Sequence, residues 1–140
     1  MATKVEVTAI LEERTGAMLA LVRQLTGLAD RPNVQHAIAW AVRRLGGTTA
    51  SFVEATDAEV SAITKEEALI DLAELRLLDS MYGNLTAVTN RTGPIQDDYN
   101  DLARRLEAAR TEKRGEILSV HGIDVNGSSS PSKPVLMWAV

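Results

Sequence analysis

Two histidines are the side chains best suited to acid–base or metal chemistry, because the 140 residues include no cysteine. His36 precedes Trp40 by about one helical turn, and His121 stands before Gly122. Neither has a second histidine or a carboxylate four residues away, the spacing that a helical metal site uses. We interpret His36 as a packed or capping residue and His121 as a positive group complementing the end of a helix dipole.

Carboxylates and glycines do not form a catalytic pattern either. The adjacent pairs Glu12-Glu13, Glu66-Glu67 and Asp97-Asp98 point in different directions on a helix, so we interpret them as solvated faces and helix-start charges. Gly46-Gly47 lacks the following Gly-Lys-Ser/Thr of a phosphate-binding loop. The sequence therefore predicts a protein that is not an enzyme and that holds no metal or cofactor.

Concentrated positive charge occurs in two dibasic pairs, Arg43-Arg44 and Arg104-Arg105. Their apolar and acidic neighbours favour solvated helix faces or salt bridges between subunits over phosphate clamps. The chain carries 15 basic and 19 acidic residues, a net charge of −4. This balance argues against non-specific DNA binding, which requires a basic face.

Apolar residues recur at helical spacing and predict an all-α body, a bundle of about four helices. The first helix is expected over residues 5–28, with a kink or a division into two helices at Gly16. The second is expected over 34–45, with Asn33 as its N-cap.

Two threonines, Thr56 and Thr64, each precede a glutamate by three residues, the pattern of a capping box. The first box predicts a short turn of helix, and the second predicts a long helix over 65–82. Its apolar face is so broad that it should be surrounded by other elements. Gly83-Asn84 is predicted to end this helix, and the β-branched segment 85–92 to be extended or irregular.

The last predicted helix runs from Pro94 to about His121, with acidic residues first and basic residues later. Its apolar stripe is a narrow seam, interrupted at Lys113 and continued by Ile117 and Val120.

The helical body, residues 1–122, is followed by a linker and an extended C-terminal arm, residues 123–140. A segment rich in serine, glycine and proline precedes the apolar end, residues 135–140. Left in water, these apolar residues would be an aggregation hazard. Their own bundle could cover them, or they could add a strand to another chain with Trp138 as the anchor.

The sequence Asp71-Leu72-Ala73-Glu74-Leu75-Arg76-Leu77-Leu78-Asp79-Ser80-Met81-Tyr82-Gly83-Asn84-Leu85, followed by Gly93-Pro94, a charged last helix and an extended arm, resembles the head-to-tail connector, or adaptor, proteins of tailed bacteriophages and gene transfer agents. The resemblance implies a ring of copies, typically a dodecamer, beneath the portal, linking the capsid to the tail. It further implies that the arm docks on the portal protein and that a tail or stopper protein attaches below. DNA would pass through the channel without specific binding.

On this resemblance, the portal-docking residues are Val135, Leu136, Met137, Trp138 and Val140. The segment 86–92, which includes Arg91, would face a neighbouring subunit or the channel. Possible subunit or channel contacts are Arg43, Arg44, Arg91, Arg104 and Arg105. The expected location is the neck of the virion, after assembly in the cytoplasm of a bacterial host, with no membrane contact.

Two other interpretations stay open. A small helical nucleic-acid-binding regulator or DNA-packaging factor would use the dibasic pairs as phosphate contacts, and its affinity would fall steeply with salt. A generic partner-binding domain would instead dimerise by exchanging its arm.

Overall fold

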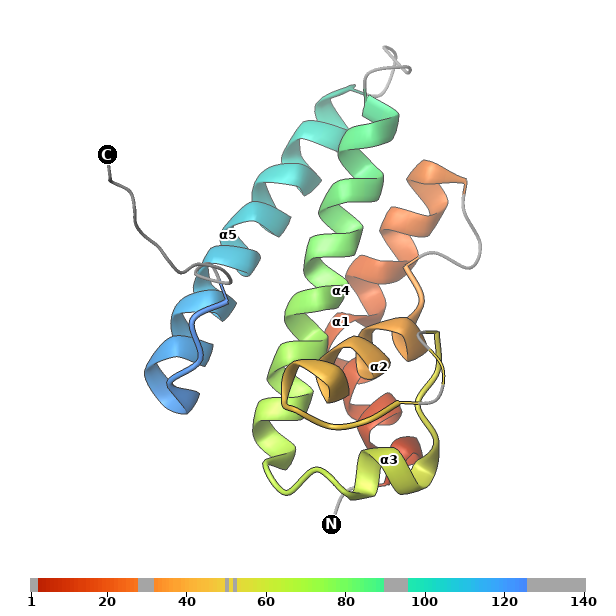
Figure 1. Cartoon of the computed structure of the whole chain (residues 1–140). Coiled ribbons are helices and arrows are strands. Elements are labelled where there is room, and N and C mark those ends of the chain that lie inside the picture. The colour runs from red at the N-terminus through yellow and green to blue at the C-terminus, as the bar shows by residue number, and fades with distance from the viewer. Residues whose placement is uncertain (1–2, 28–31, 50, 52, 90–95, 126–140) are drawn as a thin grey trace, which may run out of the picture.

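The computed structural model describes residues 3–27, 32–49, 51, 53–89 and 96–125. Over these residues the fold is an all-α bundle, as predicted, with five helices and no strand (Figure 1). None of these helices is long and apolar enough to cross a membrane.

The first helix, α1, spans Lys4–Thr26 without interruption. A capping box starts it: the Thr3 hydroxyl accepts from the Glu6 amide, and the Glu6 carboxylate accepts from the Thr3 amide. Gly27 ends it in the left-handed region. The predicted break at Gly16 is wrong, because one glycine costs only about 1 kcal/mol and buried residues on both sides of it hold the helix together.

The second helix, α2, spans Val34–Arg44 and has the predicted N-cap, since the Asn33 side chain accepts from the amide of Gln35 at 2.8 Å. Gly46 follows with a φ of 86°, a left-handed conformation that glycine adopts without strain. Short helix α3 spans Asp57–Ser61 and begins with the predicted capping box.

Helix α4 spans Glu66–Thr89, so the predicted end at Gly83-Asn84 is wrong. The extended conformation predicted for 85–92 is also wrong as far as Thr89, and residues 90–92 lie outside the described residues. Leu85 is fully buried. Burial of a leucine stabilises by about 2 kcal/mol, which outweighs the weak helix preference of the preceding glycine and asparagine.

The apolar core lies around α4, which confirms that its broad apolar face is surrounded. Helices α1, α2 and α5 all pack against α4, whereas α1 and α2 contact each other less extensively (Figure 1). The fully buried large side chains come from these four helices: Leu11, Ile38, Leu69, Leu72, Leu75, Leu77, Met81, Leu85, Leu102, Leu106 and Ile117.

Helix α5 spans Gln96–His121 and packs principally against α4. The seam buries Leu102, Leu106 and Ile117 as predicted, but Val120 is 64% exposed, so its place in the seam was wrong. Past α5, Ile123 and Val125 pack against the core, and an Arg44 guanidinium nitrogen donates to the Asp124 carbonyl at 3.3 Å. The packed body therefore extends to Val125.

Candidate functional site

The two dibasic pairs are placed apart and have different partners. Arg43 donates to the Thr49 hydroxyl at 3.4 Å, and Arg44 donates to a carbonyl beyond α5. On α5, Arg104 and Arg105 are exposed and lie 4.0 and 3.8 Å from the Asp101 carboxylate. The pairs therefore do not form one basic face. Arg91 and the docking residues Val135, Leu136, Met137, Trp138 and Val140 lie outside the described residues.

The interpretations of the two histidines have different outcomes. His36 is exposed on α2, so the packed interpretation is wrong, and it accepts no capping bond among the described residues. His121 does stand at the end of α5, but its ring reaches a side chain of α4. Its Nε2 atom lies 2.8 Å from Oδ2 of Asp71.

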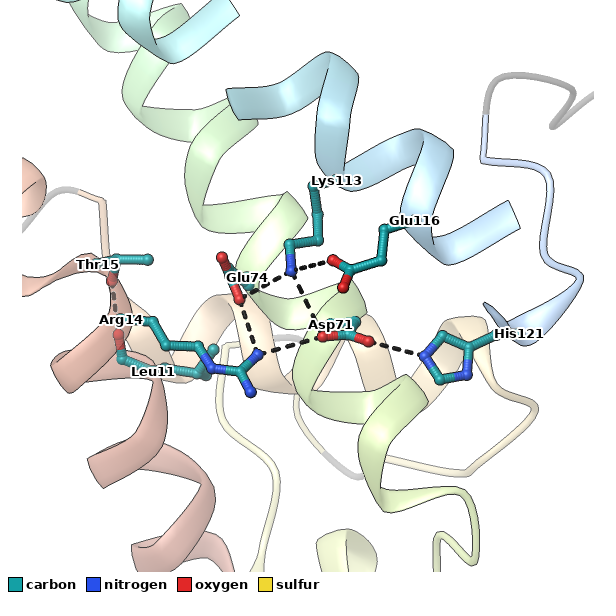
Figure 2. Close-up of polar contacts among 8 residues, drawn as sticks. All are labelled: Leu11, Arg14, Thr15, Asp71, Glu74, Lys113, Glu116 and His121. Carbon is teal, nitrogen blue, oxygen red and sulfur yellow. Dashed lines mark hydrogen bonds and ion pairs between the residues drawn. The ribbon is translucent and has the colours of Figure 1, made fainter. Parts of the chain in front are cut away.

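Asp71 belongs to a group of ionisable side chains between three helices, which we name the interhelical cluster (Figure 2). Its members are Arg14 of α1, Asp71 and Glu74 of α4, and Lys113, Glu116 and His121 of α5. Asp71 and Glu74 are one helical turn apart, so both carboxylates lie on the same side of α4. The two α4 carboxylates are therefore at the centre of the cluster.

Cations from both flanking helices share the two α4 carboxylates. Arg14 Nη1 lies 3.2 Å from Asp71 Oδ1 and 3.0 Å from Glu74 Oε1. Lys113 Nζ lies 3.6 Å from the same Asp71 oxygen and 3.3 Å from the same Glu74 oxygen. A third contact, of 2.7 Å, joins Lys113 to Glu116 within α5. Figure 2 shows Arg14 and Lys113 reaching the carboxylates from opposite sides.

The cluster is largely shielded from water. The side chains of Asp71 and Glu74 are each 14% exposed, and that of Lys113 is 12% exposed. Burial acts to lower the pKa of Lys113, but the hydrogen bond to Glu116 and the charges of Glu74 and Asp71 outweigh it and raise this pKa. The hydrogen bond to Glu74 likewise raises the pKa of Arg14. Both cations are therefore held in their charged forms.

This arrangement is suited to fastening helices together. Asp71 and Glu74 already accept from cations, and no serine or threonine of the described residues donates to His121. Within the described ranges, no three or more histidine and carboxylate side chains are placed to hold a metal ion. We conclude that the cluster locks α1 and α5 onto α4.

A second polar contact fastens the middle of α5. Asp79 of α4 accepts from Arg110 at 2.6 Å and from Arg114 at 3.4 Å. The Arg110 guanidinium also lies over the Tyr82 ring, 4.5 Å from its centroid. Together with the interhelical cluster, this contact fixes the position of α5 along α4.

Sequence reasoning missed both polar contacts, although two signals pointed to the cluster. Lys113 interrupts an otherwise apolar seam, and a lysine facing a neighbouring helix needs an acidic partner there. Asp71 and Glu74 supply that partner at helical spacing on the neighbouring helix α4.

Comparisons with known proteins place the chain in no group: no family model, no curated protein and no solved structure matches it.

Proposed function

We propose that this chain is a non-enzymatic head-to-tail adaptor of a tailed bacteriophage or gene transfer agent, and that its copies form a ring beneath the portal. The C-terminal arm would dock on the portal protein, with the tail or a stopper protein attached below. Two observations support the proposal: the resemblance of the sequence to these adaptors, and the exposed apolar side chains at the end of α5.

The observation that carries the proposal is the pair of exposed apolar side chains at the end of α5. Leu118 is 52% exposed and Val120 is 64% exposed, whereas the neighbouring Ile117 is fully buried. Successive helix residues differ by about 100° in direction, so Leu118 and Val120 lie on opposite sides of Ile117. The chain thus presents apolar groups on two different faces at one end of α5.

Two different apolar faces suit a cyclic assembly. In a ring, each copy contacts one neighbour through one surface and the other neighbour through a second, distinct surface. The interhelical cluster holds this end of α5 on α4, so both faces are presented on a firmly fixed helix. Exposed Arg104, Arg105 and Asp101, nearer the start of α5, supply both signs of charge for complementary subunit edges.

The experiment is a mass measurement in solution, alone and with portal protein, on the full chain and on Leu118→Glu and Val120→Glu. Each substitution places a charge on one of the two faces, so each should prevent ring formation. Val5→Glu is the matched control, because Val5 is 74% exposed on α1. Rings that persist in both α5 variants would refute the role of these faces.

The arm is tested by removing residues 131–140. The truncated chain should keep its helical circular dichroism, since all described residues remain, but it should no longer bind portal protein. Unchanged portal binding would contradict the docking role of Val135 to Val140.

A further inference from the structure

A groove of about 340 Å³ lies between α2 and α4, on a different side of α4 from α5. Two stripes of polar and aromatic side chains line it. On α2 the stripe repeats at intervals of four and three residues, and on α4 at intervals of four, so each stripe lies on one helix face. The stripes are His36, Trp40 and Arg43 on α2, and Arg76, Ser80 and Asn84 on α4.

The described residues that line the groove include no carboxylate, although the chain is acidic overall. The charges of α4 are segregated. Asp71, Glu74 and Asp79 are paired with cations of α1 and α5, whereas Arg76 faces α2. No acidic group among the described lining residues therefore neutralises the positive charge of Arg76.

Arg76 differs from the other arginines. Within the described part of the chain, it is the one arginine with no hydrogen bond or ion pair, and its guanidinium lies over the Trp40 ring, 5.3 Å from the centroid. The cation–π interaction holds the guanidinium beside the indole, and its N–H groups have no acceptor among the described residues. The forked N–H groups of a guanidinium match the oxygens of a phosphate group.

Other polar groups of the groove are also without internal acceptors or donors. The side chains of His36, Ser80 and Asn84 and the indole N–H of Trp40 make no hydrogen bond to any described residue. Aromatic rings and guanidinium planes are the groups on which unpaired bases stack. The groove therefore combines phosphate donors with a stacking surface.

We propose that this groove binds an unpaired nucleotide of single-stranded nucleic acid. Arg76 contacts its phosphate, and the base packs against His36 and the Trp40–Arg76 stack. A recess between two helices admits a base that is splayed out of its strand, whereas bases within a duplex are already stacked and paired. This inference does not depend on the adaptor proposal, because it uses none of the residues of α5 or the arm.

Fluorescence anisotropy with labelled oligo-dT, oligo-U and a blunt duplex, each of about 15 nucleotides and at about 50 mM salt, tests the inference. The full chain should bind both single strands and discriminate against the duplex. Arg76→Gln should weaken binding roughly tenfold, since it removes a charge-assisted contact to phosphate. The ratio of the affinities for oligo-dT and oligo-U shows whether the groove prefers DNA or RNA.

Arg105→Gln is the matched control, because it makes the same change in net charge at an exposed position of α5. It should alter the affinity by less than about twofold. Absence of saturable binding, an equal loss in both variants, or duplex affinity equal to that of the single strands would overturn the inference.

A second readout locates the ligand. The chain has two tryptophans, so Trp138→Phe leaves Trp40 as the reporter. Saturating oligonucleotide should change the emission of Trp40 in this variant. Unchanged emission at saturation would place binding outside the groove and overturn the assignment.

Discussion

His121, the last residue of α5, lies 2.8 Å from Asp71 near the start of α4 and joins positions that are 50 residues apart in the sequence. The contact requires α5 to run antiparallel to α4, so that its end returns to the start of α4. Asp71 is simultaneously 3.2 Å from Arg14 of α1. One carboxylate therefore ties three helices together.

Replacing Asp71 with asparagine should destabilise the fold. The change keeps the shape of the side chain but removes the charge that faces Lys113 and Arg14, and it leaves the largely buried Lys113 under-compensated. We expect a loss of about 2 kcal/mol in the free energy of unfolding, measured by urea denaturation. Asp101→Asn, which alters an exposed pair on α5, should cost less than about 0.5 kcal/mol. Equal effects of the two variants would show that the cluster contributes no more than a surface pair.

The same cluster predicts a loss of stability at alkaline pH. Burial acts to lower the pKa of Lys113, but Glu116, Glu74 and Asp71 together raise it above the ordinary value of 10.5. A folded-state pKa above the unfolded value means that the contribution is fully present below about pH 10 and is lost as the pH rises through the folded value. The free energy of unfolding should therefore fall as the pH rises above about 10.

Lys113→Met should flatten this alkaline decline while lowering stability at neutral pH. Lys65→Met is the control, because Lys65 is exposed before α4 and has no ion pair with a described residue. Urea denaturation across the alkaline range measures both. An identical alkaline decline in the Lys113→Met variant and the full chain would assign the transition to other groups.

Two glycine-to-alanine substitutions should change the stability of the fold in opposite directions. A Cβ at Gly47 would lie 2.7 Å from Val42 Cγ1 and 2.9 Å from both the Val42 carbonyl oxygen and Ile63 Cδ1. Gly47→Ala should therefore destabilise by about 1–3 kcal/mol. Gly16→Ala, where nothing lies within 4 Å, should stabilise α1 by about 0.5–1 kcal/mol. Thermal denaturation followed by circular dichroism compares them, and a stabilising Gly47→Ala would contradict the close packing there.

Leu85→Ala tests whether α4 continues past Gly83. Leu85 is fully buried on this part of the helix, so truncation should cost about 2–4 kcal/mol. Leu118→Ala, at a half-exposed position of α5, should cost less than about 1 kcal/mol. A small effect at Leu85 would mean that this segment does not pack on the core.

Local signals in the sequence predicted the helix starts well. The Asn33 cap and the Thr56 capping box both form as expected, because such bonds depend only on residues within one turn. The end of α4 was predicted wrongly for the same reason. Gly83-Asn84 is a local stop signal, but burial of Leu85 against distant residues overrides it.

The interhelical cluster could be predicted only in part. Lys113 is recognisable in the sequence as an interruption of the α5 seam, but its contact with Glu74 depends on the antiparallel register of α5 on α4. The contact of Arg14 with Glu74 depends in addition on how α1 packs against α4. The α2–α4 groove is harder still. The stripes of His36 and Arg76 are readable along each helix, but which face of α2 meets which face of α4 is decided by the packed core.

The central position of α4 has a consequence for synthesis of the chain. α1 and α2 leave the ribosome before α4, yet the larger surface on which both pack belongs to α4. Until Glu66–Thr89 has emerged, the apolar faces of α1 and α2 lack their main partner. Chaperones that bind apolar helices can therefore bind α1 and α2 of the nascent chain until α4 has emerged and packs against them.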